Sequence, residues 1–187
     1  MERTAMASKF VFAALLAIFA VMSATPNAQA ATAGEIDSGV SATLDRFFGK
    51  IAGARELADK SVGILVFPSV VKAGFGVGGE YGEGALRVRG GSVAYYNTVS
   101  ASFGFQLGVQ ERSVIIMFMT QQALDQFRKT AGWKIGVDGS VAIITIGAGG
   151  SIDTNKIMSP VVGFILDPKG LMYNLTLEGS KISRISR

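Results

Sequence analysis

Apolar and polar positions follow a helical rhythm in the first part of the chain after residue 30. Between residues 34 and 60 apolar residues recur every three or four positions, at Ile36, Val40, Leu44, Phe47, Ile51, Ala54 and Ala58. At 100° per residue these positions share one arc, so the pattern predicts an amphipathic helix with one apolar face, bordered by Arg46 and Lys50. Gly39, Gly49 and Gly53 each weaken a helix by roughly 1 kcal/mol relative to alanine, so we expect a partner surface to hold it.

From residue 61 the pattern changes to that of β-strands. Strand-like runs of β-branched, aromatic or alternating residues lie at 62–67, 86–89, 92–96, 100–109 and 114–119. Gly90-Gly91 offers a two-residue turn and predicts a hairpin between the second and third of these runs. The continuous apolar run at 114–119 is typical of a strand that is buried on both faces.

A short helix is expected to interrupt the strands at 120–130. Thr120 can cap its start, and Gly132 can end it. Strands are then expected at 133–137, 141–146, 161–166 and 171–177, the first two joined by a turn at Asp138-Gly139. The chain has 24 glycines, most of them in the strand region, so we expect tight bends there. The predicted fold is therefore α+β: a strongly bent, barrel-like antiparallel sheet with an N-terminal amphipathic helix and one short helix near 120–130.

The N-terminus has the layout of a secretory signal. Arg3 and Lys9 precede an uncharged apolar run from residue 10 to residue 22, and Ala28-Gln29-Ala30 provides a small-x-small cleavage pattern. The run is shorter than the roughly 20 apolar residues that span a bilayer. We therefore predict a signal peptide at 1–30, cleaved after Ala30, and a periplasmic or secreted protein; the alternative is an uncut anchor. One domain is expected over 31–187.

Composition excludes most common catalytic and metal chemistry. The chain has no cysteine and no histidine, so it can have no disulfide, thiol nucleophile, Ser-His-Asp triad or His-based metal site. Without residues 1–30 it keeps 16 Lys and Arg against 13 Asp and Glu, a net charge of +3. This bias is too weak to indicate nucleic acid, but it is compatible with an anionic membrane surface.

Two local motifs do not support an active site. Gly74, Gly76 and Gly79 match G-x-G-x-x-G, but the residues that follow make a poor helix, whereas a dinucleotide site needs a helix to begin there. Glu80 and Glu83 are three positions apart, so along a strand they would point to opposite faces. We expect no enzyme activity, no cofactor and no metal.

The stretch from Gly63 to Ile185 resembles the SYLF domain family. The segments that carry the resemblance occur in the family's order, and they are residues 63–68, 72–79, 95–97, 104–108, 132–133, 148–153 and 170–174. The resemblance implies binding rather than chemistry, since eukaryotic members are associated with phosphoinositide membranes and, in some cases, with actin. Bacterial relatives are typically exported, often as lipoproteins, and this chain departs from them in having no cysteine to lipidate.

The family's lipid contact is attributed to an amphipathic N-terminal helix with basic residues. Transferred to this chain, the resemblance implies a lipid-binding site formed by Arg46, Phe47, Phe48, Lys50, Arg55 and Lys60, with Lys72 as a nearby addition. The expected partner is an anionic phospholipid or glycolipid surface. Packing of the same helix on the sheet is the alternative interpretation of its apolar face.

The resulting hypothesis is a non-enzymatic, periplasmic lipid-binding SYLF-type domain that associates with membranes peripherally. Two other functions remain open at this stage. One is a structural or stress-related periplasmic module that binds a protein partner, and the other is a small outer-membrane β-barrel. The helix at 34–60 and the doubly buried run at 114–119 argue against the barrel.

Overall fold

The structure is a computed structural model that describes residues 30–145, 152, 157–169, 177 and 179–187. Residues Ala31–Arg187 form one compact unit. The predicted signal peptide lies outside the described residues, as do residues 148–151 and 170–174 of the family pattern and most of the strand predicted at 171–177.

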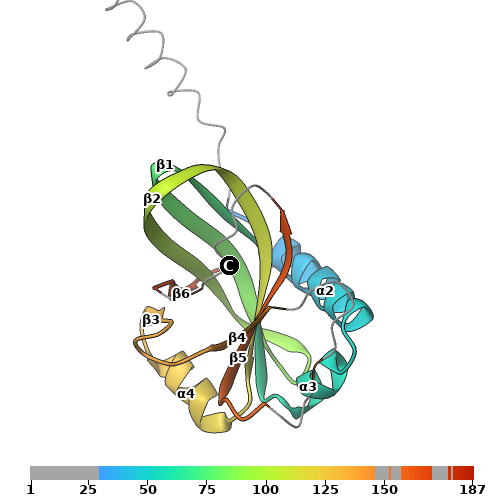
Figure 1. Ribbon diagram of the computed structural model, residues 1–187. Helices are drawn as coiled ribbons and strands as arrows, with labels where there is room; N and C mark the ends of the chain where they lie inside the picture. Colours follow the sequence, from blue (N-terminus) through green and yellow to red (C-terminus); the bar gives the residue numbers. More distant parts are fainter. Residues whose placement is uncertain (1–29, 146–151, 153–156, 170–176, 178) are drawn as a thin grey trace, which may run out of the picture. The chain divides into compact units, whose positions relative to one another are not determined.

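One long antiparallel hairpin dominates the fold (Figure 1). It consists of β1, Gly63–Val88, and β2, Gly91–Phe118, which are 26 and 28 residues long and pair along their whole length. Strands of five to six residues are usual, so the sequence pattern wrongly divided each of these strands into shorter pieces. The turn is Arg89-Gly90 rather than Gly90-Gly91, with φ angles of 53° and 83°. Positive φ at both central residues is what a type I′ hairpin turn requires.

The hairpin bends so strongly that β1 contacts itself. Its pairing with β2 shifts register near Pro68, near Gly76 and after Leu86, and such bulges increase the bend of a strand. Residues 82–84 consequently lie against residues 66–70. A Cβ atom at Gly84 would lie 2.1 Å from the carbonyl oxygen of Val66, so only glycine fits at this crossing.

Four shorter strands complete the sheet, in the order β3-β6-β2-β5-β4, with β1 paired to β2. The second half of β2 pairs with β5, and its first half pairs with β6. All pairs are antiparallel except β4 with β5, so the predicted bent antiparallel sheet and α+β class are confirmed with one parallel pair. The bounds of these strands are Trp133–Lys134 for β3, Ala142–Thr145 for β4, Val161–Lys169 for β5 and Lys181–Ile185 for β6.

The hairpin expected around Asp138-Gly139 does not form. β3 pairs with β6 and β4 pairs with β5, so the two segments separate. The Asp138 carboxylate instead accepts a hydrogen bond from the backbone N–H of Lys134 at 2.7 Å. This side-chain contact closes a local turn and competes with the strand pairing that the sequence suggested.

The predicted helix at 34–60 is two helices, α2 at Ala33–Lys50 and α3 at Ala54–Lys60. The break falls at Gly53, whose φ of +82° lies in the left-handed region. Thr32 and Glu35 form a reciprocal capping box at the start of α2. The second predicted helix is confirmed as α4, Gln121–Lys129, capped by Thr120 as expected.

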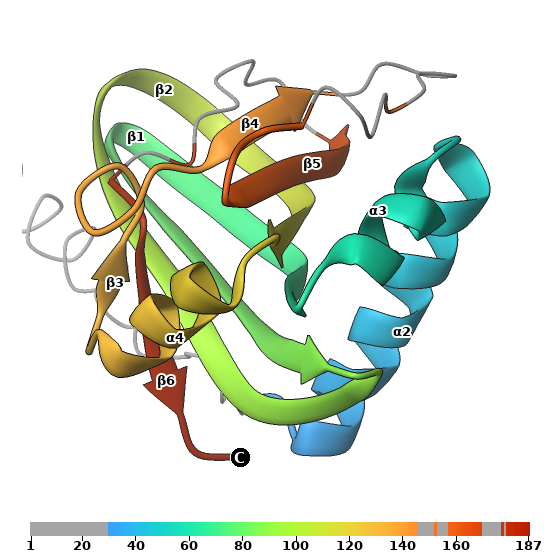
Figure 2. The same ribbon diagram turned by 90° about the horizontal axis from the view of Figure 1, so that it is seen from below.

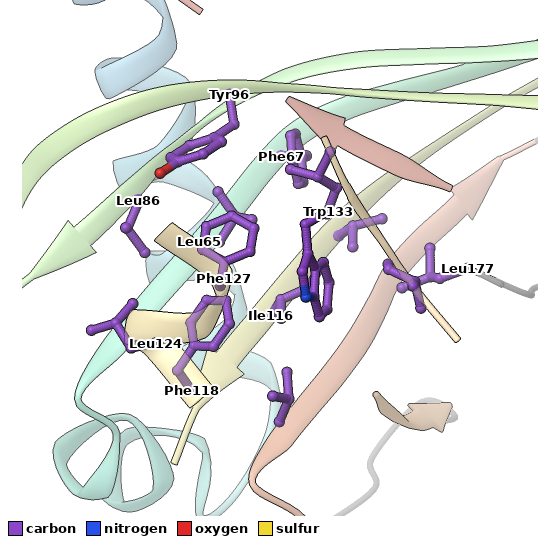
Figure 3. Packing of buried hydrophobic residues seen from close by; sticks show 14 of the residues in the cluster. Leu65, Phe67, Leu86, Tyr96, Ile116, Phe118, Leu124, Phe127, Trp133 and Leu177 are labelled. Atoms are coloured by element: carbon purple, nitrogen blue, oxygen red, sulfur yellow. The ribbon is translucent and has the colours of Figure 1, made fainter. Parts of the chain in front are cut away.

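Two hydrophobic clusters lie on opposite faces of the sheet. In the first, α4 packs inside the bend of the hairpin, and the Phe127 ring lies 4.9 Å from Tyr96, 4.9 Å from Phe118 and 5.4 Å from Trp133 between centroids (Figure 3). In the second, α2 covers the other face. Figure 2 shows α2 and α3 on one side of the β1–β2 hairpin and α4 on the other.

Candidate functional site

The apolar face of α2 is docked on the sheet rather than presented outward. Ile36, Val40 and Leu44 are buried, and Phe47 is fully buried with its ring 5.0 Å from that of Phe164 in β5. The prediction that Phe47 contacts lipid is therefore wrong for this structure, because the ring is needed to fill the interface between helix and sheet.

Polar contacts hold α2 in the same position. The Asp37 carboxylate accepts hydrogen bonds from Ser92 Oγ at 2.6 Å and from the Tyr95 hydroxyl at 2.9 Å. Arg87 Nη2 donates to Ser41 Oγ at 2.7 Å and to the Asp37 carbonyl at 3.3 Å. The hydrogen bond to Asp37 raises the pKa of Tyr95 above its usual value, since it favours the protonated phenol.

Lys72 is not part of a surface site. It lies on β1, only 7% exposed, in register with the buried Gln110. Close by along the hairpin, Arg112 and Glu80 form an ion pair at 2.7 Å, with side chains 2% and 4% exposed. The prediction that Lys72 adds to a lipid contact is therefore wrong, because its side chain belongs to a buried polar region of the hairpin.

All of the remaining predicted residues except Lys60 line one of two grooves. The first, the α2 groove, has a volume of about 670 Å³ and lies between α2 and the sheet. Arg46 and Lys50 line it with Glu111 and Ser113. Arg46 Nη2 donates to Thr43 Oγ1 at 3.2 Å and to Ser113 Oγ at 3.3 Å, which fixes the guanidinium at the wall of the groove.

The second groove is larger and more cationic. It has a volume of about 950 Å³ and lies between α2, α3, the hairpin tip and the start of α4. Four arginines line it, Arg55, Arg87, Arg89 and Arg128, against one acidic residue, Asp59, giving a local charge of four minus one, or +3. We call it the arginine groove. Its other lining residues include the apolar side chains of Leu44, Phe48, Ala58, Val62, Ile64, Val88, Val93 and Leu124.

Phe48 and Arg55 meet inside the arginine groove. The Arg55 guanidinium carbon lies 4.6 Å from the centroid of the Phe48 ring, a cation–π arrangement. Lys60, by contrast, lies in an exposed ion pair with Glu56 at 2.7 Å, one helical turn away on α3. Its charge is thus partly offset within its own helix.

Part of the chain is similar to a known protein family. Residues 99–186 match the family Ysc84, described as "Las17-binding protein actin regulator". The resemblance to the SYLF family is confirmed. No curated protein matches the chain. The matched SYLF segment begins within β2 and includes α4 and β3 to β6, whereas α2, α3 and β1 precede it.

The sequence analysis did not predict three residues of the arginine groove, Arg87, Arg89 and Arg128. Arg87 and Arg89 are two positions apart in the strand predicted at 86–89, so the strand period predicted that they share one side, and this was an available signal. Arg128 gave no such signal, because only the position of α4 in the folded domain brings it to the groove. The α3 residue Arg55, which the resemblance implied, provides the link between the predicted site and these three residues.

Two kinds of feature are absent from the part of the chain that the structure describes. No helix there is long and apolar enough to cross a membrane. No three or more acidic side chains gather there as metal ligands. The expectations of no enzyme activity, cofactor or metal stay predictions.

Proposed function

We propose that this chain is an exported, non-enzymatic SYLF-type protein that binds anionic lipid surfaces peripherally. The observation that supports the proposal best is the outward placement of basic side chains on α2 and α3. Arg46, Lys50, Arg55 and Lys60 are all exposed, and Phe48 lies partly exposed among them. The export signal and the periplasmic or secreted location are part of the same proposal.

Docking of α2 changes the binding mechanism from the one that its amphipathic pattern suggests. A helix that adsorbs to a membrane buries its apolar face among the lipid chains. In this protein that face is already buried against the sheet, so the contact is made through head groups. Each Lys or Arg near an anionic surface contributes on the order of 1 kcal/mol.

Co-sedimentation of residues 31–187 with vesicles tests the proposal. We expect binding to vesicles that contain phosphatidylglycerol, increasing with its content and decreasing at high salt, because exposed charges are screened. Arg46→Gln with Lys50→Gln should weaken binding by about 2 kcal/mol, or roughly 30-fold. Neutral replacements are preferable to charge reversal, since Glu111 lines the same groove.

Lys134→Gln with Lys181→Gln is the matched control. Both side chains are exposed on β3 and β6, away from α2, and the same charge is removed. Equal loss in the two double variants would show a response to net charge and exclude the α2 site. Absence of binding at every lipid composition would exclude the lipid function itself.

A protein-binding module is the second candidate. Two observations favour it: the description of the matched family names a protein partner, and Val71, Tyr81, Val99 and Val109 are exposed apolar side chains on the hairpin. Recovery of one stoichiometric partner from envelope extracts, together with absence of vesicle binding, would support this function over the first.

A further inference from the structure

We propose that the arginine groove binds the phosphate monoester head group of a membrane lipid. This inference rests on the proposed function, and it assigns a ligand class to residues outside the helix that the family resemblance implicates. The groove lies where the tip of the β1–β2 hairpin meets α2, α3 and α4.

The charge of the groove is assembled by the fold. Its arginines come from four places along the chain: Arg55 from α3, Arg87 from β1, Arg89 from the turn and Arg128 from α4. The local charge of +3 equals the net charge of the whole of residues 31–187. The four arginines repel one another, and an anion bound between them would reduce this repulsion. The groove therefore favours an anionic ligand.

Arg87 is held in place as part of this wall. Its Nη2 is occupied by Ser41 Oγ and the Asp37 carbonyl, whereas its Nε is buried without a hydrogen-bond partner. A guanidinium presents five N–H donors in a fixed fork that matches the oxygens of a phosphate. The contacts to α2 therefore fix the Arg87 side chain at the wall of the groove.

Arg89 occupies a backbone position that arginine does not favour. Its φ of 53° is the left-handed conformation, which is unfavourable for L-residues other than Asn and Asp. Asn-Gly is the preferred sequence for this turn. The exposed Arg89 side chain lines the groove, so an anion contact offers a functional reason for a residue that the turn itself does not favour.

Apolar side chains distinguish a lipid from a free phosphate. Phe48, Ile64, Val88 and Val93 share the groove with the arginines, and Val93 is 46% exposed. A free phosphate ion has nothing to place against them, whereas a lipid has glycerol and acyl carbons. A monoester carries about −1.5 to −2 charges at neutral pH, more than a diester, and so neutralises more of the groove.

Calorimetric titration of residues 31–187 with dihexanoyl phosphatidic acid below its micelle concentration tests the proposal. Phosphatidylcholine with the same tails and inorganic phosphate are the comparison ligands. We expect the monoester lipid to bind about tenfold or more tightly than either, because only it satisfies both the arginines and the apolar lining. Equal binding of phosphatidylcholine would reduce the groove to an apolar site, and equal binding of inorganic phosphate would make it a free-anion site; either result overturns the proposal.

The variants separate the groove from general charge. Arg89→Gln with Arg128→Gln removes two exposed side chains and should weaken monoester binding about tenfold or more, while Lys134→Gln with Lys181→Gln should leave it unchanged. Arg89→Lys keeps the charge but loses the fork, so it should weaken binding as well. Unchanged binding in the arginine double variant would overturn the proposal.

Failure of this inference and failure of the proposed function give different results. If the groove assignment is wrong, the protein still binds vesicles that contain phosphatidylglycerol. Adding phosphatidic acid to these vesicles then gives no increase in binding that is lost in the Arg89→Gln, Arg128→Gln variant. If the proposed function is wrong, phosphatidylglycerol vesicles do not bind at any content, whatever the calorimetry shows for the soluble monoester.

Discussion

At the scale of single residues, two glycines decide whether β1 can cross itself. Gly82 and Gly84 are buried where the strand passes over its own earlier part. A Cβ atom at Gly82 would lie 2.8 Å from the carbonyl oxygen of Ser69, and one at Gly84 still closer to that of Val66. Backbone atoms cannot move aside as the end of a flexible side chain can, so these positions exclude every other residue type.

We expect Gly84→Ala to destabilise the fold by about 3 kcal/mol, because overpacking against backbone forces the crossing apart. Gly79→Ala is the control, since no atom lies within 4 Å of a Cβ there and its glycine is exposed. The control should leave stability unchanged or slightly raised. Urea unfolding measures both variants, and equal midpoints would show that the crossing is not as tight as described.

The sequence predicted the chemistry of single residues better than their position. Arg46 and Lys50 were placed correctly at the exposed border of the α2 face, and Phe48 and Arg55 do line a groove. Phe47 and Lys72 were not recognised as buried. Helical periodicity identifies an apolar face, but whether lipid or protein covers that face depends on contacts with distant strands, which periodicity does not contain.

At the scale of elements, docking of α2 determines which of two adjacent phenylalanines stabilises the fold. Phe47 points into the cluster with Phe164, whereas Phe48 lies partly exposed under Arg55. The ring centroids are 5.8 Å apart, yet Phe47 fills the interface with the sheet and Phe48 lines the arginine groove. The helix is thus a structural element on one side and part of the candidate site on the other.

Phe47→Ala should cost about 3–5 kcal/mol of unfolding free energy, as expected for a large cavity in a core. Phe48→Ala should cost much less, because the ring is partly exposed, but it should weaken binding of the lipid monoester. Denaturant unfolding and calorimetry on both variants provide the comparison. A larger loss of stability in Phe48→Ala than in Phe47→Ala would contradict the docked position of α2.

Element types were largely predictable, while element lengths were not. The two caps at Thr32 and Thr120 and the strand content follow from local rules, although only the second cap was anticipated. Continuity of β1 and β2 could not be read from sequence, because glycines that normally interrupt strands are here accommodated by bends and bulges. The parallel pairing of β4 with β5 depends on contacts between distant segments.

At the scale of residues 31–187, the strand segment at 114–118 joins the two hydrophobic clusters. Ile116 and Phe118 belong to the cluster around α4, while Ile115 and Met117 belong to the one beneath α2. The continuous apolar run predicted a strand buried on both faces, and this is confirmed. Both faces of the domain are therefore stabilised through one strand.

Stability should decrease at high pH, because three tyrosines of the hairpin have raised pKa values. Burial raises the pKa of Tyr96, partial burial and a hydrogen bond to Glu83 raise that of the half-exposed Tyr81, and the hydrogen bond to Asp37 raises that of Tyr95. The folded state holds these protons more tightly, so their contribution is complete below the unfolded pKa of about 10 and is lost as pH rises through the folded values.

The free energy of unfolding measured in urea should therefore fall from about pH 10 upward. Tyr95→Phe should show a shallower decrease, since one of the three groups is removed, with absorbance of the tyrosinate monitoring ionisation directly. A constant unfolding free energy across this range would contradict the raised pKa values.

The Arg89-Gly90 turn also bears on how the domain is assembled in time. A two-residue loop is among the quickest to close, whereas the last pair of the hairpin, Gly63 with Phe118, joins positions 55 residues apart. We infer that pairing begins at this turn and propagates outward, so that β5 and β6 find their partner strand only afterwards. The Arg89-Gly90 turn, where an arginine has a positive φ, would then be the folding nucleus of the domain. The Arg89 side chain would be exposed from the start of folding.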